Sequence, residues 1–348
     1  MRRLFHLLVA AHLLVATGVT AVVLHSVAPL PLRLPAPGRV VAVGDIHGDA
    51  TAFLRTLKTA GLIDAEATIH DASWTGGNAT LVQCGDILDR GAEEAECWAL
   101  LHRLKAQAPQ TDGRVVALLG NHEVMNVIGV AGQFVHPVGR TSFGPDRKAA
   151  FAAGGPLALE LADLCCYVAV IIGSSCFVHA NLPADATDDS LNALNTQTRE
   201  WLLGARALED LPKNFVNGRR GPQLTASPIW GRGLGAERPA TLHCDAIRRT
   251  LRRLGVSRVV VGHTPQRSGI NAACDGLVWR CDTGMSQFVC SGACEALEID
   301  DRDDGLSAVR VLREGGKVED MHYWAADGCD VDGMTATADA WYDIYGMQ

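Results

Sequence analysis

Four short hydrophobic runs of this chain end in clusters of Asp, His and Asn, and this repetition constrains the fold more than any other feature. The clusters are residues 44–49 (GDIHGD), 85–91 (GDILDRG), 120–123 (GNHE) and 262–264 (GHT). Each follows a run of aliphatic and β-branched residues, which predicts a buried strand. Ligands of open α/β sheets bind at the carboxyl ends of the strands. The clusters therefore predict an α/β protein with one shared polar site.

The order of the expected helices and strands supports this class. Strands are expected at 40–43, 80–83 and 114–119, with helices at 50–60 and 93–106 between them, which makes a βαβαβ opening. The later expected elements are a helical stretch at 147–164, paired strands at 167–172 and 176–178, a helix at 244–254 and a strand at 258–261. Three further runs, 277–281, 296–299 and 308–312, are expected to be successive strands of a second sheet.

The clusters contain the side chains that hold divalent metal ions. Asp45 and His47 lie two positions apart, so that both can turn toward one cation from an extended segment. Asp86 supplies a carboxylate that can bridge two metals. The other candidate donors are Asn121, His179 and His263. Such a mixed set suits Mn, Fe or Zn better than Ca or Mg, and two metals about 3.5–4 Å apart serve phosphoryl hydrolysis. A single Asp at a strand end is more often a helix N-cap, so only the combination indicates a site.

Three of the motifs are similar to the signature of a known family. GDIHGD, GDILDRG and GNHE resemble the phosphoprotein phosphatase branch of the calcineurin-like metallophosphoesterases, over about residues 39 to 300. Glu123 and the triplet at 89–91 point into this branch, because many relatives outside it have Asp after the Asn-His pair. The resemblance implies two packed mixed β-sheets flanked by helices. It also implies a hydrolase of phosphoric monoesters.

The resemblance implies a role for each motif residue. Two divalent metals would be bound by six residues, with Asp86 bridging them. These residues are Asp45, His47, Asp86, Asn121, His179 and His263. His122 would be the general acid that protonates the leaving oxygen, Asp89 would orient it, and Arg90 would bind phosphate. A hydroxide that bridges the metals would attack phosphorus in line. Manganese is the expected metal, with iron or zinc as alternatives.

Two segments depart from the eukaryotic Ser/Thr enzymes of this branch. His179 is followed by Ala-Asn where those enzymes have two glycines, and residues 227–232 read SPIWGR instead of a Trp-Ser-Asp-Pro stretch. Both segments look like those of the Shewanella-like (bacterial-like) protein phosphatases. Arg232 is the candidate for a second phosphate-binding guanidinium, because a bidentate fork matches phosphate oxygens. Arg219 and Arg220 compete for this role.

Three functions are compatible with these motifs. The leading hypothesis is a phosphoprotein phosphatase that acts on phosphotyrosine, on phosphoserine and phosphothreonine, or on both classes. A dinucleoside-polyphosphate hydrolase shares the three opening motifs, but it needs an aromatic platform for the base, and only Trp74 and Trp230 stand out. An inactive phosphoprotein-binding module usually lacks a ligand or the acid, and here all are present. A net charge of −8 does not favour binding to nucleic acid, which needs a basic surface. A content of 48% hydrophobic residues excludes a disordered chain.

The N-terminal segment is expected to be a hydrophobic helix. Arg2 and Arg3 precede an apolar run that extends to about residue 24, long enough to span a bilayer. Residues 1–28 are therefore expected to be a signal peptide or membrane anchor, which predicts a secretory or membrane-associated location; organelle targeting is a third reading. A proline-rich linker (29–38), a phosphoesterase domain (39–315) and a C-terminal extension (316–348) follow.

The chain has eleven cysteines, an odd number without the spacing of a disulfide framework or zinc site. Most are expected to be buried apolar side chains. Cys84 immediately precedes the candidate metal-ligand turn at 85–91, and Cys281 lies near the end of a late strand, which leaves a redox switch as a minor alternative. The pairing of the cysteines stays open.

Overall fold

Three parallel strands, β4 (Val40–Val43), β5 (Thr80–Gln83) and β6 (Arg114–Ala117), begin the first of two mixed sheets. The structure is a computed structural model that describes residues 10–16, 19–25, 30–165, 167–212, 215, 227–236, 242–301 and 307–320. The sheet continues on the other side of β4 through antiparallel strands, and these are β12 (Ala296–Asp301), β13 (Ser307–Arg313) and β14 (Lys317–Asp320).

The second sheet also has six strands. In spatial order they are β10 (Asn271–Ala273), β11 (Val278–Arg280), β9 (Arg258–Val261), β8 (Ser175–Val178), β7 (Ala169–Ile172) and β3 (Arg33–Leu34). Strands β8, β9 and β11 are parallel, and β7 and β10 run antiparallel to their neighbours β8 and β11.

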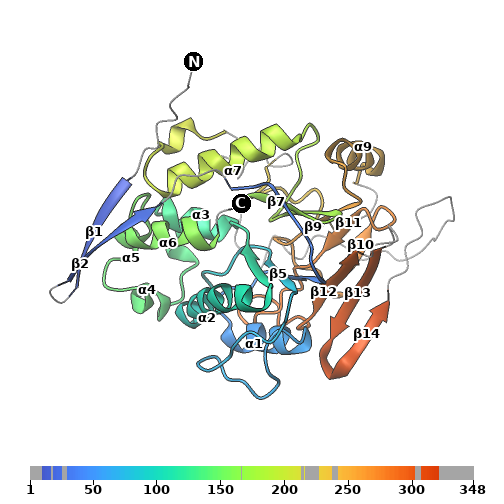
Figure 1. Cartoon of the computed structure of the whole chain (residues 1–348), viewed down its shortest axis with the longest axis horizontal. Coiled ribbons are helices and arrows are strands. Elements are labelled where there is room, and N and C mark those ends of the chain that lie inside the picture. Colours follow the sequence, from blue (N-terminus) through green and yellow to red (C-terminus); the bar gives the residue numbers. More distant parts are fainter. Residues whose placement is uncertain are drawn as a thin grey trace.

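Helices cover the outer face of each sheet (Figure 1). On the side of the first sheet lie α1 (Ala50–Thr59), α2 (Glu94–Gln107), α3 (Asn121–Val127), α4 (Gly139–Ser142), α5 (Arg147–Phe151) and α6 (Pro156–Leu164). On the side of the second sheet lie α7 (Asp188–Leu202) and α9 (Cys244–Leu254). Short 3-10 turns occur at Ala108–Thr111, Ala131–Gln133, Leu208–Asp210 and Glu314–Gly316.

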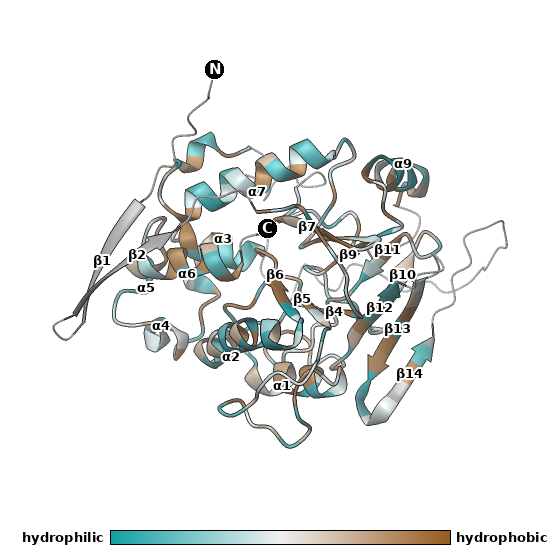
Figure 2. Ribbon diagram, viewed as in Figure 1, coloured by the Kyte–Doolittle hydropathy of each residue, from teal (hydrophilic) through white to brown (hydrophobic). Residues whose placement is uncertain are grey.

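The alternation of side chains along each strand produces four layers. Val41 and Val43 pack with Phe53 of α1 on the helix side of the first sheet. Val40 and Ala42 of the same strand join a separate cluster between the two sheets, together with Val82, Phe177, Val260 and Trp279. A third cluster lies between the second sheet and the helices α7 and α9. In Figure 2, α9 is coloured mostly hydrophilic, and α7 alternates between hydrophilic and hydrophobic residues. The expected class, two packed mixed sheets flanked by helices, is confirmed.

One expectation about the sheets is wrong. The runs at 277–281, 296–299 and 308–312 do not form successive strands of one second sheet. β11 pairs with β9 in the second sheet, whereas β12 and β13 extend the first sheet beside β4. These strands have similar hydrophobic patterns, and pattern alone does not say which partner a strand takes. The expected helical stretch at 147–164 is also divided, because Gly154 adopts a left-handed φ of 79° between α5 and α6.

The expected N-terminal helix is not shown. The described residues of this segment form two antiparallel strands, β1 (Ala10–Ala16) and β2 (Val19–His25). Their sequences contain several β-branched Val and Thr residues, which favour strands over helices. No helix in the described part of the chain has the length and apolar character needed to cross a membrane. Most of the C-terminal extension, from residue 321, lies outside the described residues.

The described cysteines are mostly buried, as expected. Six described cysteines are buried and Cys290 is half-buried. One disulfide, which the sequence left undecided, joins Cys244 at the start of α9 to Cys274 in the turn after β10. It ties α9 to the edge of the second sheet.

Candidate metal centre

The predicted site residues come together at the carboxyl ends of strands from both sheets. Asp45 and His47 follow β4, Asp86 follows β5, and Asn121 begins α3 after β6. His179 follows β8 directly, and His263 comes two residues after β9. All six side chains are buried, with exposed fractions of at most 6%. The sequence therefore predicted both the edge of the fold and the residues that meet there.

Asp86 lies at the centre of two groups of donor atoms. His47, Asp86 and His122 place ligand atoms within 4.8 Å of one another, and so do Asp86, His179 and His263. Separate carboxylate oxygens of Asp86 face the two groups, because Oδ2 lies 3.7 Å from His47 Nε2 and Oδ1 lies 3.5 Å from His179 Nε2. The single carboxylate of Asp86 thus faces two adjacent candidate positions for a cation.

Each candidate imidazole is oriented by a backbone carbonyl. His47 Nδ1 donates to Leu88 O at 3.0 Å, and His179 Nδ1 donates to Cys84 O at 2.7 Å, so Nε2 of each ring carries the lone pair. His263 has the opposite arrangement. Its Nε2 donates to Trp230 O at 3.2 Å, and its buried Nδ1 has no hydrogen-bond partner among the described residues. The three rings therefore direct a lone pair at the site.

The electrostatics of the cluster fit a cation. The lone pair of His179 Nε2 faces the oxygens of Asn121 and Asp86 at 3.1 and 3.5 Å, an arrangement of acceptors that a positive ion would stabilise. Burial lowers the pKa of His179 to about 4, which keeps the imidazole neutral and able to bind metal. Burial also raises the pKa of Asp86 to about 8. Neutral imidazoles with buried carboxylates form the donor set of a divalent transition metal.

Beside this cluster, His122 and Asp89 form a buried pair. His122 Nδ1 lies 2.7 Å from Asp89 Oδ2, which leaves Nε2 on the other side of the ring. Burial raises the pKa of Asp89 to about 6, and the Asn126 amide and the Arg147 guanidinium act against this rise. Asp89 is therefore placed to accept the Nδ1 proton of His122.

A network that the sequence did not predict supports this pair. Arg147 Nη2 donates to Asp89 Oδ1 at 3.2 Å and to Glu94 Oε2 at 3.0 Å. Glu94 also accepts the Asp89 backbone N–H at 3.0 Å, and Asn126 Nδ2 donates to Asp89 Oδ1 at 3.0 Å. Asp89 is thus fixed on both carboxylate oxygens.

Glu123 fixes the backbone that carries Asp86. Its buried carboxylate accepts N–H groups from Asp86, Ile87, Leu88 and Gly120 at 2.9–3.2 Å. A side chain at Gly120 would overlap the carboxylate of Asp86, so only glycine allows this approach. Asp86 and Asp89 themselves have left-handed φ angles of 57° and 69°. The turn is strained locally and is stabilised by Glu123.

Comparison with known proteins agrees with this geometry. A family model described as calcineurin-like phosphoesterase matches residues 38–267. The chain belongs to the calcineurin-like phosphoesterase family. This phosphoesterase is 32% identical over 328 residues to Shewanella-like protein phosphatase 2 of Arabidopsis thaliana, covering 80% of this chain and 79% of the relative. It is 29% identical to Shewanella-like protein phosphatase 1 of Plasmodium berghei, with 80% and 76% covered.

These relatives place the phosphoesterase in the Shewanella-like group, as its motifs predicted. Among solved structures, a cold-active protein tyrosine phosphatase is similar, with a TM-score of 0.68 and 23% identity over 84% of this chain and 81% of that one. A Saccharomyces cerevisiae protein serine/threonine phosphatase is similar with a TM-score of 0.53 and 16% identity, over 87% of this chain and 86% of that one. Both likenesses show a shared fold.

The segment that marks this group in the phosphoesterase packs against the donor cluster. Ala180 N donates to Pro228 O at 2.9 Å, which joins the residues after His179 to the 227–232 segment. In that segment, Trp230 O orients His263, and Arg232 Nη1 donates to His263 O at 3.3 Å. The Arg232 guanidinium interacts electrostatically with Asp282, Asp45 and Asp86. Arg219 and Arg220, its competitors, lie outside the described residues.

Two further residues of the phosphoesterase frame the cluster. Arg90 lies beside it, with its guanidinium carbon 5.4 Å from the centre of the Phe134 ring. Asp282, which the sequence analysis did not select, is buried after β11, and burial raises its pKa to about 6. Its position two residues beyond the end of β11 was the available signal. Cys84 is buried beside Cys281, and this contact and burial raise its thiol pKa, which disfavours a redox switch.

Proposed function

We propose that the chain is a metal-dependent phosphoprotein phosphatase that hydrolyses phosphomonoesters of tyrosine, of serine and threonine, or of both. The observation that carries the proposal is Asp86, which is shared by two donor groups, one of which includes His122 of the His122–Asp89 pair. That arrangement supplies both a position for two cations and a proton donor. The names of the relatives, which are protein phosphatases, support the choice of a phosphoprotein.

We assign two divalent metal ions to this site, with manganese first and iron or zinc as alternatives. Asp45, His47 and Asp86 would hold one ion, and the other would be held by Asp86 with Asn121, His179 and His263. Such a pair supplies charge neutralisation of the phosphoryl group and activation of a water nucleophile. The buried unpartnered Nδ1 of His263 supports this assignment.

The chain's own residues would bind the ester and move one proton. Arg90 and Arg232 would bind phosphoryl oxygens, because guanidinium groups match them in charge and geometry. His122 would donate its Nε2 proton to the leaving oxygen, and Asp89 would orient the ring and stabilise its positive charge before that proton leaves. Glu123 and Arg147 would position these groups without touching the substrate.

The structure does not favour a dinucleoside polyphosphate as substrate. Both aromatic side chains considered as a base platform are buried in the hydrophobic core beside the helices. Trp74 Nε1 donates to Gly77 O, and Trp230 Nε1 donates to Phe215 O. Neither ring is available to stack on a base.

The experiment is an assay of the full chain with Mn²⁺ on matched phosphotyrosine, phosphoserine and phosphothreonine peptides, with Asp86→Asn as the control. We expect release of phosphate that requires both the metal and Asp86, and the peptide preference then identifies the substrate class. Release of phosphate from a dinucleoside tetraphosphate, with no cleavage of the peptides, would reject the proposal.

We also propose that the N-terminal segment directs the protein to a secretory or membrane-bounded compartment. The Cys244–Cys274 disulfide supports this, because disulfides persist mainly in oxidising compartments. Expression of the full chain in a eukaryotic cell should give membrane-enclosed protein that resists added protease until detergent is present. Protein that is freely digested in the cytosolic fraction would contradict it.

A further inference from the structure

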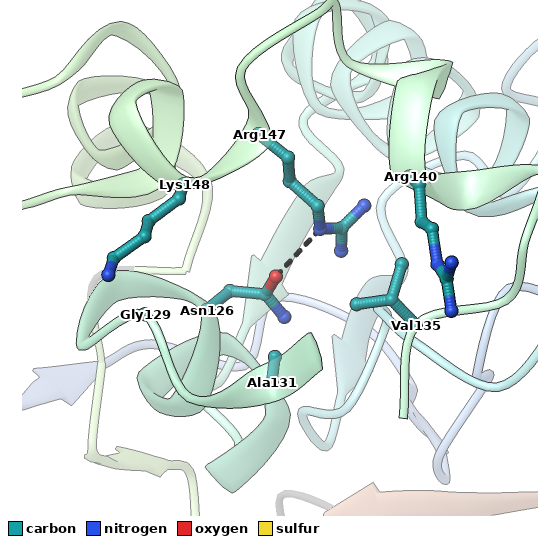
Figure 3. A pocket seen from close by; sticks show the side chains of 7 residues that line it. All are labelled: Asn126, Gly129, Ala131, Val135, Arg140, Arg147 and Lys148. Carbon is teal, nitrogen blue, oxygen red and sulfur yellow. Dashed lines mark hydrogen bonds between the residues drawn. The ribbon is translucent and has the colours of Figure 1, made fainter. Parts of the chain in front are cut away.

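A small cavity lies next to the His122–Asp89 pair (Figure 3). Its volume is about 150 Å³, and its lining includes Asn126, Ala131, Val135, Arg140, Arg147 and Lys148. We call it the basic pocket. It touches the site through Asn126 and Arg147, which both hydrogen-bond Asp89. No role in the reaction described above uses its other lining residues.

Two of the three cations of the basic pocket have no acidic partner in the described part of the chain. Arg147 forms ion pairs with Glu94 and Asp89. Arg140 and Lys148 are exposed, and no ion pair between described residues includes either one. Figure 3 shows them on opposite sides of Arg147. The pocket therefore offers positive charge to an external group.

The size of the basic pocket limits its ligand. A water molecule in the liquid occupies about 30 Å³, so the cavity volume equals that of roughly five waters. Pockets for drug-sized molecules are larger, about 300 Å³ or more. Ala131 and Val135 supply apolar surface beside the cations. These features fit the end of one acidic side chain with its methylene groups.

Apolar side chains around the basic pocket indicate a peptide surface. Four large hydrophobic side chains are exposed among the described residues, and two of them, Val130 (44%) and Val138 (56%), belong to the segment that lines the pocket. A third, Phe288 (38%), contacts His136 of that segment with ring centres 5.6 Å apart. Exposed apolar groups that cluster beside a site mark an interaction surface.

The same segment also borders the phosphate position. Phe134 lies between the pocket residues Ala131 and Val135, and its ring contacts His122 at 5.2 Å and Arg90 at 5.4 Å. An extended peptide advances about 3.3–3.6 Å per residue, so residues close in sequence to a phosphorylated residue held at Arg90 can reach this segment.

We propose that the basic pocket binds an Asp or Glu side chain of the substrate, close in sequence to the phosphorylated residue. The inference rests on the proposed function and adds a preference for acidic phosphopeptides. Arg140 and Lys148 are the specificity residues. Arg140 and Lys148 bind the acidic side chain of the substrate and do not contact the phosphoryl group.

The test is a series of phosphopeptides in which one Glu or one Gln is moved through the positions on each side of the phosphorylated residue. Full-length wild-type protein with Mn²⁺ should cleave the Glu peptide with the higher kcat/KM at one or two positions. Arg140→Ala/Lys148→Ala should remove that advantage, a loss of about three- to tenfold, since exposed charge pairs contribute modestly. Its cleavage of Gln peptides and of p-nitrophenyl phosphate should stay at the wild-type rate.

A matched control removes two positive charges elsewhere. Arg249 and Arg252 are exposed on α9, which lies on the opposite side of the molecule from α4 and α5 in Figure 1. Arg249→Ala/Arg252→Ala should keep the full Glu advantage. If both double variants lose it equally, the effect is one of net charge and the basic pocket is rejected.

Other outcomes separate this inference from the proposed function. An unchanged Glu advantage in Arg140→Ala/Lys148→Ala overturns the inference while the phosphatase stands. A change only in inhibition by inorganic phosphate would identify a free anion as the ligand and would also overturn it. Binding of a fluorescent unphosphorylated Glu peptide requires no turnover. Weaker binding to the double variant therefore supports the pocket even if no phosphopeptide is cleaved, and equal binding rejects it.

Discussion

Replacement of His122 by Asn is expected to lower kcat on phosphopeptides by about 10²- to 10⁴-fold, the usual contribution of a positioned general acid. The reason is the geometry of the ring, which Asp89 fixes through Nδ1 at 2.7 Å while Nε2 lies on the opposite side. Steady-state kinetics with Mn²⁺ measures the effect. The loss should be much smaller on p-nitrophenyl phosphate, whose leaving group needs little protonation.

Asp89→Asn provides the matched comparison for this prediction. It keeps the size of the side chain and removes the charge that holds the Nδ1 proton of His122, so it should show the same dependence on leaving group with a smaller loss. Both variants should retain bound metal, which elemental analysis determines. An equal loss on both substrates, or a loss of metal, would show that His122 acts mainly as a ligand rather than as an acid.

The second large effect is expected from removal of metal, and it should depend on pH. Burial raises the pKa of Asp86 to about 8, of Glu123 to about 7 and of Asp282 to about 6. Their unfolded values are near 4. The lowered pKa values of the buried histidines, such as His179 at about 4, act in the opposite sense below about pH 6.5. Between about pH 6.5 and pH 8 the folded, metal-free chain therefore binds more protons than the unfolded chain. Its free energy of unfolding should fall as the pH rises through this window.

Added cation should reverse this trend, because metal binds the deprotonated carboxylates. At a thousandfold excess over Kd, binding to the folded state alone contributes about 4 kcal/mol. That corresponds to a rise in Tm on the order of 10 °C. Calorimetry with and without Mn²⁺ at pH 5 and pH 8 should show the larger rise at pH 8, and Asp86→Asn should lose most of it. An equal rise at both values would contradict the prediction.

The candidate site could be predicted because its signals are local. Asp45 with His47, and Asp89 with Asp86, are short spacings at strand ends, and His179 and His263 follow strands in the same way. Parallel strands bring such ends together regardless of the details of packing. These site residues could therefore be predicted from the sequence before any tertiary contact was known.

The supporting residues could not be predicted, since their roles arise only from tertiary contacts. Arg147 reaches Asp89 across 58 positions of the chain, and no local pattern distinguishes it from other surface arginines. Glu123 was noticed as a family marker, but its four backbone hydrogen bonds depend on how two turns meet. The pairing of β12 with β4 could not be predicted either, because the hydrophobic pattern of a strand identifies its buried face and not the strand beside it.

The donor group of Asp86, His179 and His263 takes members from both sheets. A cation held there would join segments far apart in the sequence, as a covalent cross-link does, but a chelator could remove it. Neither sheet alone has this donor group, so the group can be complete only after the sheets have docked. Uptake of a cation by this donor group would then be a late step of assembly. A cation at this centre would thus act as a reversible cross-link between the two sheets as well as a catalytic group.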